Sequence, residues 1–177
     1  QTARQLAALF NLSAIDAPDA LLTELPAPKN IVDALRILLD TMFPGKISGA
    51  AVKAPDLGDF LIRRLAEGWR LLHREIRRAL PYRWIGEAAR AEGARPPKVE
   101  NLDRETDRIL KAFLDTLPGV RKLLVADVQA AYDGDPAALT FAEVLLSYPG
   151  LLAIAAHRLA HELYRLRVPI IPRIMSA

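Results

Sequence analysis

Two histidines near the end of the 177-residue chain have the spacing of paired metal ligands. His157 and His161 stand four residues apart in a strongly apolar, helical-looking stretch, so their rings share one helix face. A zinc-protease motif requires Glu directly after the first His, and here Arg158 stands there. The only other His in the sequence is His73, on a distant predicted helix. The sequence therefore predicts no metal site, and we expect both rings to hydrogen-bond within a packed helix bundle.

Three carboxylates gather in the stretch "DVQAAYDGDPAA", where Asp127, Asp133 and Asp135 lie in or beside one predicted turn. One interpretation is local turn chemistry, because Asp-Gly and Asp-Pro favour backbone bends. The other is that a carboxylate beside the rigid Pro136 holds a small cationic or hydroxylated substrate. The residues by themselves leave both interpretations open. The chain shows no nucleophile with a base, no glycine-rich phosphate loop and no acid–base pair, so we predict no catalytic residue.

A basic stripe follows one face of a long predicted helix, opposite its leucines, and consists of Arg63, Arg70, Arg74 and Arg77. Such a stripe can meet phosphates, but more often it is a solvated face or pairs with acidic residues of another subunit. The stripe has neither interleaved aromatic residues nor a helix-turn-helix signature. Nucleic-acid binding is therefore a minor hypothesis, and we expect none.

The composition is that of an ordinary globular domain, with 51% hydrophobic and 25% charged residues. The absence of cysteine excludes disulfides, thiolate chemistry and zinc–cysteine sites, and it fits a reducing compartment. A net charge of +3 does not by itself indicate a nucleic-acid partner. No apolar run reaches the roughly 18 residues of a membrane span. We expect one domain, with an arm before it, and no membrane partner.

The elements that must position these residues are all predicted to be helices. A first helix has Asn30 as its N-cap and ends at Pro44-Gly45, and a flexible stretch follows over residues 45–56. Leucines and other apolar residues then recur every three or four positions from Leu57 to Leu80, which predicts one long amphipathic helix that Pro81 stops. "EGARPPK" is predicted to be a loop.

The second half of the chain continues the same pattern. A helix beginning near Leu102 is expected to break at Pro118-Gly119, with Pro118 in the first turn of another helix that runs to about Tyr132. "TFAEVLLS" predicts a short helix with Thr140 and Glu143 in a capping box. The last long helix is expected from Leu151 to about Arg167. Because no segment alternates with period two, the predicted class is all-α, a multi-helix, bundle-like domain.

The end of the chain resembles the end of the amino-terminal helical domain of bacterial serine acetyltransferases. The resemblance is dense over about residues 127–177 and diffuse before that. Its elements are D-[IV]-Q-A-x(4)-D-P-A, Tyr148-Pro149-Gly150, the His157-Arg158-x-x-His161 helix with Leu163-Tyr164, and Ile171-Pro172-Arg173. The earlier "RILLDTMFPG" is similar to the longer-armed branch of that family. The resemblance divides the chain into an amino-terminal arm, residues 1–29, and the helical domain, residues 30–177.

The resemblance implies a serine O-acetyltransferase, which transfers acetyl from acetyl-CoA to the hydroxyl of L-serine in the first step of cysteine biosynthesis. In that family the helical domain precedes a left-handed parallel β-helix, which is absent from this chain. The family's general-base histidine and its supporting aspartate lie on the β-helix. We therefore expect the chain alone to be catalytically incomplete, with no cofactor bound by this portion and acetyl-CoA as co-substrate of the full enzyme.

One functional position carries over from the family, because Asp135 matches its D-P aspartate that contacts serine. A fixed carboxylate can accept from the ammonium or the hydroxyl of serine and orient the hydroxyl toward the base. Asp127 and Asp133 are expected to be helix-end and turn residues.

The resemblance also implies partners: a trimer or dimer of trimers, and O-acetylserine sulfhydrylase. We expect a cytoplasmic protein. The alternative hypothesis is a self-standing helical oligomerisation or protein-interaction module, which rests on the apolar stripes and the basic helix face.

Overall fold

The computed structural model describes residues 24–83 and 100–177, and every regular element in these ranges is helical, which confirms the all-α prediction. The elements are α2 (Pro28–Met42), a 3-10 turn η2 (Ala54–Asp56), α3 (Leu57–Ala79), α5 (Glu100–Gly134), α6 (Phe141–Ser147), α7 (Pro149–Arg165) and α8 (Ile171–Met175). The predicted loop "EGARPPK" and most of the predicted arm lie outside the described residues.

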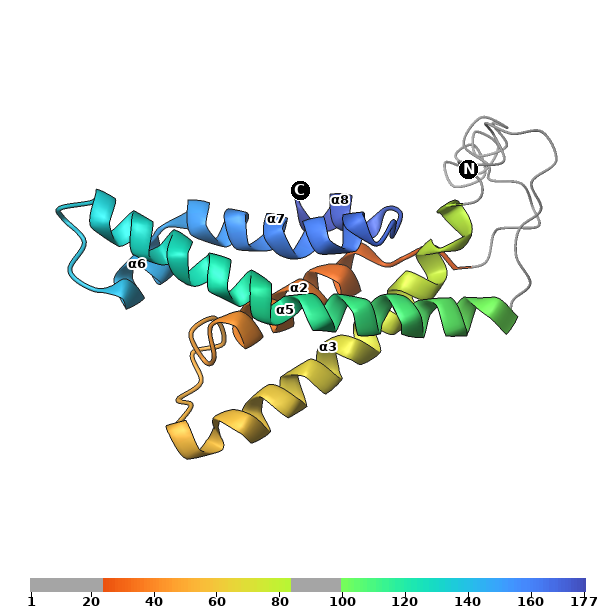
Figure 1. The fold of residues 1–177 in the computed structure, drawn as a ribbon, viewed down its shortest axis with the longest axis horizontal. Coiled ribbons are helices and arrows are strands. Elements are labelled where there is room, and N and C mark those ends of the chain that lie inside the picture. The colour runs from red at the N-terminus through yellow and green to blue at the C-terminus, as the bar shows by residue number, and fades with distance from the viewer. Residues whose placement is uncertain (1–23, 84–99) are drawn as a thin grey trace, which may run out of the picture.

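Helix α2 forms the centre of the fold, since it contacts α3, α7 and α8. Helices α5 and α7 run side by side along the long axis of the molecule, while the amino-terminal half of α3 projects away from them (Figure 1). The core lies where these helices meet, and burying a large apolar side chain there is worth about 1.5–3 kcal/mol relative to exposure. Its largest fully buried members are Phe113, Ile31, Leu38, Leu72, Ile76, Leu80, Ile109, Leu110, Leu124, Leu159, Leu163 and Ile171.

Helix α3 confirms the long amphipathic helix, because it runs from Leu57 to Ala79 and ends just before Pro81. Proline has no N–H and fixes its own φ, so it cannot continue the preceding turn. Helix α6 is also confirmed, with Thr140 as its N-cap. Half of the predicted capping box forms, since Thr140 accepts from the Glu143 N–H, while the Glu143 side chain accepts from the N–H of Leu139 and not from that of Thr140. Helix α7 begins at Pro149 and ends at Arg165, within two residues of the expected boundaries.

Helix α5 contradicts the prediction of a break at Pro118, because it continues as one helix of 35 residues through that proline. Burial explains the difference. Leu110, Phe113 and Leu117 before the proline, and Val120 and Leu124 after it, are all buried in the same core. Packing of this apolar face outweighs the cost of a proline in the helix interior, which is about 3 kcal/mol.

The start of α2 also differs from the prediction, since Asn30 lies inside the helix and Ala27 is the N-cap. The cap comes from another helix. The fully buried Glu75 of α3 accepts a hydrogen bond from the Ala27 N–H at 2.7 Å and another from the Asn30 side chain at 2.8 Å. Arg78 donates to the same carboxylate at 3.2 Å. Glu75 thus satisfies a free N–H at the start of α2 that a local cap would otherwise take.

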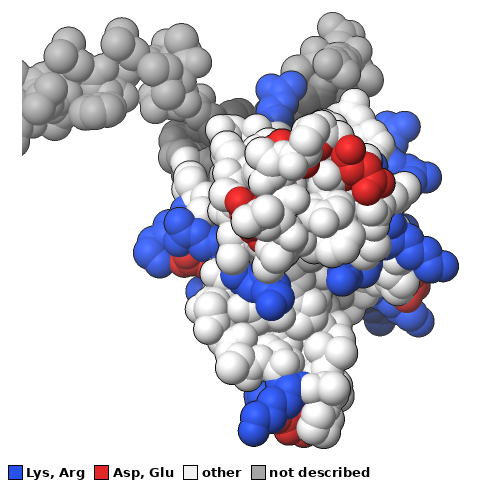
Figure 2. Space-filling view, turned by 90° about the vertical axis from the view of Figure 1, so that its left-hand side faces the viewer, with Lys and Arg blue, Asp and Glu red and all other residues white. Residues whose placement is uncertain are grey.

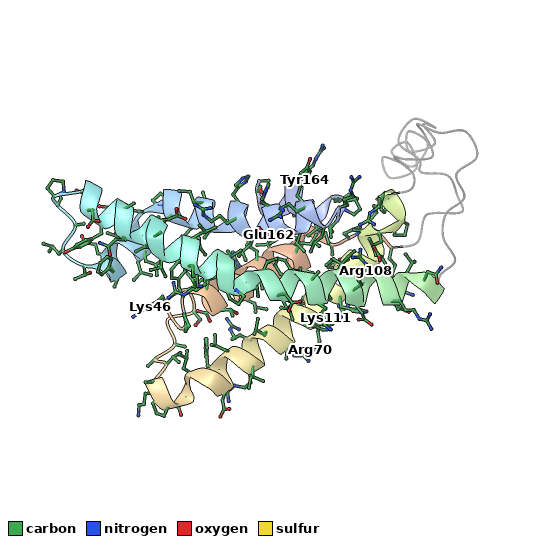
Figure 3. The ribbon with its side chains drawn as sticks, in the orientation of Figure 1. Lys46, Arg70, Arg108, Lys111, Glu162 and Tyr164 are labelled. Atoms are coloured by element: carbon green, nitrogen blue, oxygen red, sulfur yellow. The ribbon has the colours of Figure 1, made fainter. Side chains whose placement is uncertain are left out.

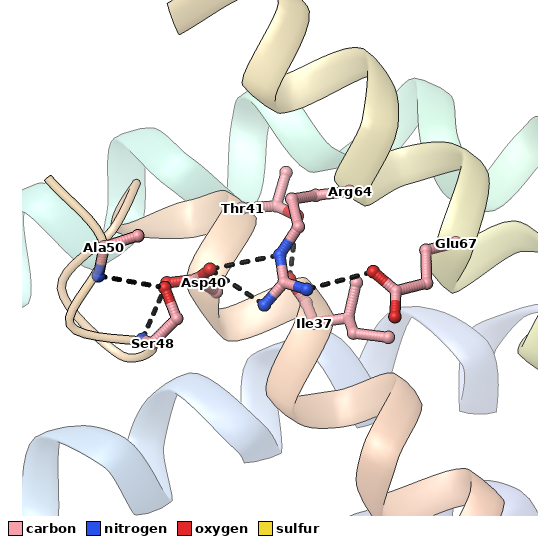
Figure 4. Close-up of polar contacts among 7 residues, drawn as sticks. All are labelled: Ile37, Asp40, Thr41, Ser48, Ala50, Arg64 and Glu67. Atoms are coloured by element: carbon pink, nitrogen blue, oxygen red, sulfur yellow. Dashed lines mark hydrogen bonds and ion pairs between the residues drawn. The ribbon is translucent and has the colours of Figure 1, made fainter. Parts of the chain in front are cut away.

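A buried carboxylate ties the carboxyl end of α2 to α3 (Figure 4). Asp40, whose side chain is 1% exposed, accepts from Arg64 Nη2 at 2.9 Å and Nε at 3.1 Å. It also accepts from the backbone N–H and the hydroxyl of Ser48, at 3.0 and 3.1 Å. Burial opposes ionisation of Asp40, but the bonds from Ser48 and Arg64 outweigh it, so its pKa lies below the ordinary value of 3.8.

The connection after α2 depends on a glycine. Gly45 has a φ of +73°, and a Cβ at this position would collide with the carbonyl oxygen of Ala50. Only glycine adopts this backbone conformation without strain and leaves that space free. The turn brings Ser48 back to Asp40 and so closes the end of α2.

We predict that Asp40→Asn lowers the free energy of unfolding by about 2–4 kcal/mol near neutral pH, because it removes the charge that Arg64 and Ser48 bind. A group whose folded-state pKa is lowered stabilises the fold above its unfolded pKa and loses that contribution as pH falls through the folded value. The difference between the two proteins should therefore be constant above about pH 5 and shrink below about pH 4. Urea unfolding at a series of pH values measures it.

Glu67→Gln is the matched control, because Glu67 binds the same Arg64 but its side chain is 45% exposed. An exposed ion pair contributes at most about 1 kcal/mol. Equal losses for the two variants, or a difference that does not change in acid, would contradict the role of Asp40.

Candidate functional site

Asp135 lies in the connection between α5 and α6, directly after the last residue of α5. Its Oδ1 accepts a hydrogen bond from the N–H of Ala137 at 2.8 Å, and its carbonyl oxygen accepts from the N–H of Ala138 at 3.0 Å. These are the bonds of an Asp-initiated turn, as the Asp-Pro sequence predicts. The turn holds the carboxylate in place by local backbone geometry.

Tyr148 reaches the same carboxylate from the other end of α6, where its hydroxyl donates to Oδ2 of Asp135. The Tyr148 bond, and after it the Ala137 N–H, lower the pKa of Asp135 below the ordinary value of 3.8. The same contact raises the pKa of Tyr148. Asp135 is therefore ionised at neutral pH. A carboxylate has about four lone-pair sites, so this half-buried side chain keeps capacity for a ligand.

The other two carboxylates of the cluster serve the scaffold. Asp127 lies inside α5, not at a helix end as expected, because α5 continues to Gly134. Its two oxygens accept from Arg158 of α7 at 2.7 and 2.8 Å, a bidentate pair that joins the two helices. Asp133 accepts from Gln129, one turn earlier on α5, at 2.8 Å.

Helix α6 fixes the loop that carries Asp135. Thr140 Oγ1 accepts from the N–H of Glu143 at 3.1 Å, and the Glu143 carboxylate accepts from the N–H of Leu139 at 2.9 Å, one residue further back than in the usual capping box. The side chains of Leu139, Phe141 and Leu146 are 80%, 48% and 60% exposed. Residues without charge form much of the surface at this end of the molecule (Figure 2).

The expectation that the two histidines are packed within the bundle is wrong, and among the described residues neither ring makes a hydrogen bond. His157 and His161 are exposed on α7, which buries its opposite face through Leu159 and Leu163. Their rings stack with centroids 6.1 Å apart, and His161 stacks on Tyr164 at 6.2 Å. Tyr164 points away from the body of the molecule (Figure 3). The three rings line a groove of about 300 Å³ between α7 and α8.

No group of three or more His, Cys, Asp or Glu side chains within residues 24–83 and 100–177 is arranged to hold a metal ion. None of the helices in these ranges is long and apolar enough to cross a bilayer. In the basic stripe, Arg63, Arg70 and Arg74 are exposed, while Arg77 pairs with Asp103 of α5 at 2.6 Å.

The chain was compared with known proteins. No family model matches it. It is 34% identical over 175 residues to the plasmid serine acetyltransferase of Synechococcus elongatus, covering 97% of this chain and 53% of that protein. It is 51% identical over 55 residues to another serine acetyltransferase of the same organism, covering 31% of this chain and 22% of that protein.

Solved structures with the same fold include serine acetyltransferase isoform 3 from Entamoeba histolytica in complex with cysteine. The TM-score is 0.58 at 20% identity, over 97% of this chain and 53% of that one. Native serine acetyltransferase 1 from the same organism has a TM-score of 0.57 at 21% identity, over 98% of this chain and 55% of that one. At this identity the likeness shows the fold.

The helical fold is that of the matched region of solved serine acetyltransferases. The chain is similar to a serine acetyltransferase along nearly its whole length, and it spans about half the length of that curated relative. The predicted resemblance is thereby confirmed.

Sequence reasoning singled out Asp135 but missed Tyr148 as its partner. Tyr148 lies thirteen residues further along the chain, and no spacing rule links the two positions. The one available signal was that both occur in the elements that carry the family resemblance. Sequence reasoning also missed the Asp127–Arg158 pair, which joins residues on two different helices.

We predict that Tyr148→Phe raises the pKa of Asp135 toward its ordinary value, because the hydroxyl that stabilises the ionised carboxylate is lost. A pH titration of the carboxyl carbon resonance by NMR measures this. Tyr132→Phe is the matched control, because the Tyr132 ring packs against Phe141 in a tilted arrangement, with 4.5 Å between centroids, and the substitution should leave the Asp135 titration unchanged. An unchanged pKa in Tyr148→Phe would contradict the contact.

Proposed function

We propose that this chain is the helical, substrate-binding and oligomerising part of a serine O-acetyltransferase, an enzyme that transfers acetyl from acetyl-CoA to the hydroxyl of L-serine. The observation that carries the proposal is the Asp135 carboxylate, held by Ala137 and Tyr148 and still partly open to solvent. The homology to serine acetyltransferases along 97% of the chain supports it.

Asp135 is suited to bind serine and not to deprotonate it. Its lowered pKa keeps it ionised, and an ionised carboxylate attracts the serine ammonium and accepts a hydrogen bond from the hydroxyl. The same lowered pKa makes it a weak proton acceptor. We therefore assign Asp135 a substrate-binding role, and the general base is a residue of the whole enzyme outside this cluster.

The remaining parts of the proposal follow the family. Residues 30–177 act as its amino-terminal helical domain, acetyl-CoA is the co-substrate, and the product enters cysteine biosynthesis. The subunits form a trimer or a dimer of trimers, and O-acetylserine sulfhydrylase is a further partner. A cytoplasmic location belongs to the same proposal, and the absence of cysteine fits a reducing compartment. Leu139, Phe141 and Leu146 are exposed apolar side chains near Asp135, and we propose that they form part of a surface that contacts another subunit or protein.

We predict that Asp135→Ala, in the complete acetyltransferase, raises the KM for L-serine about 10- to 100-fold and leaves the KM for acetyl-CoA within about twofold. Loss of a hydrogen bond to a charged group costs about 1.5–3 kcal/mol, which corresponds to this change in KM. Release of the CoA thiol measures the rate with each substrate varied in turn.

Asp133→Ala removes a carboxylate two residues earlier that binds only Gln129 in the described part of the chain, so it should leave both constants unchanged. Equal losses for serine and acetyl-CoA in Asp135→Ala would argue against the binding role. A complete protein that assembles but releases no CoA with serine would instead favour the interaction-module hypothesis.

A further inference from the structure

An open pocket of about 480 Å³ lies between the turn that follows α2, the carboxyl-terminal half of α5 and helix α6. Its floor consists of buried apolar side chains, Phe43, Val128 and Leu145, which are 7%, 8% and 5% exposed. Val125 and Phe141, each about half exposed, form its sides. This volume is in the range of small-molecule pockets, roughly 300–1,000 Å³.

The charges around this pocket are all positive. Lys46 and Arg121 line it, and none of its described lining residues is Asp or Glu. An adjoining groove of about 520 Å³ between α3 and α5 shares Pro44 and Arg121 with it. This groove adds Lys53 and again no acidic residue. Arg121 therefore lies where the pocket and the groove meet. Lys46 lies in the turn that follows α2 (Figure 3).

Arg121 is unlike the other partly buried arginines of the described structure. Arg64, Arg83 and Arg158 are 25%, 17% and 33% exposed, and each pairs with a carboxylate at 2.7–3.3 Å. Arg121 is also partly buried, but among the described residues it pairs with no carboxylate. Its guanidinium instead lies over the Phe43 ring, 5.0 Å from the centroid.

Burial without a carboxylate partner lowers the pKa of Arg121, although a guanidinium stays protonated in proteins. A partly desolvated cation beside an apolar floor gains strongly from an anion, because the low dielectric of the site strengthens the attraction. The guanidinium fork matches a carboxylate with two parallel hydrogen bonds.

We propose that this pocket binds a small organic acid with an apolar body. The carboxylate pairs with Arg121 and, at the mouth, with Lys46, while the apolar body rests on Phe43, Val128 and Leu145. Neither Asp135 nor Tyr148 lines the pocket, so the proposal does not depend on the proposed acetyl transfer.

Titration of the full-length protein with 3-phenylpropionate, followed by isothermal calorimetry or NMR, tests the proposal. We expect saturable binding with a Kd in the micromolar to millimolar range, and added salt should raise that Kd. The neutral 3-phenylpropanamide should bind at least about tenfold more weakly, since it keeps the apolar body and loses the charge. Equal binding of the acid and the amide, or no saturable binding of the acid, would overturn the proposal.

Two substitutions locate the site. Arg121→Gln should weaken 3-phenylpropionate binding at least about tenfold, and Lys122→Gln, which removes an exposed positive charge at the next residue, should leave it within about twofold. Lys46 is exposed in a turn, so Lys46→Gln should not disturb folding and tests the same pocket if Arg121→Gln fails to fold. We expect Lys46→Gln to weaken 3-phenylpropionate binding about two- to fivefold. Equal losses in Lys122→Gln and Arg121→Gln, or no loss in either pocket variant, would overturn the assignment.

Discussion

Two carboxylates without solvent access determine how α2 lies against α3. Asp40 near one end of α2 binds Arg64, and Glu75 of α3 binds the backbone at the other end of α2 as well as Arg78. A buried charge is costly unless it is paired and hydrogen-bonded. Each carboxylate therefore favours the one placement of α2 against α3 in which its hydrogen-bond donors surround it. With both ends of α2 held, the register of the α2–α3 pair is set, and the apolar faces of α5, α7 and α8 close around it.

Hydrogen bonds from arginine side chains also join the other helices, from this centre to the proposed site. Asp127 and Arg158 join α5 to α7 through two parallel hydrogen bonds. Arg83 follows α3 and donates to the carbonyls of Leu166 and Arg167, just beyond the end of α7. These bonds satisfy oxygens that a helix end leaves free. Because α5 and α7 cannot slide past each other, the residues after α5 and before α7 stay at a constant separation, and this brings the Asp135 and Tyr148 side chains together.

Two kinds of charge on this scaffold suit it to ligand binding. Asp135 is ionised and oriented but only partly satisfied, which suits a carboxylate that binds a polar substrate. Arg121 is a cation with apolar surroundings and no carboxylate in the described structure, whereas the comparable arginines are paired. No buried side-chain nitrogen or oxygen among the described residues lacks a hydrogen-bond partner. Asp135 and Arg121 are instead partly exposed, so each can exchange water for a ligand and gain free energy from it.

The sequence by itself determined the local structure wherever a signal acts within a few residues. Apolar periodicity predicts α3 and the all-α class, the Thr140 capping box predicts α6, and the Asp-Pro turn with the family resemblance singles out Asp135. Only the tertiary structure decided what depends on distant residues. Core packing carries α5 through Pro118, and α7 turns His157 to the surface. Tyr148 meets Asp135, and Arg121 lies without a carboxylate partner in the described structure. Each of these outcomes depends on burial and on contacts between helices, which local sequence patterns do not encode.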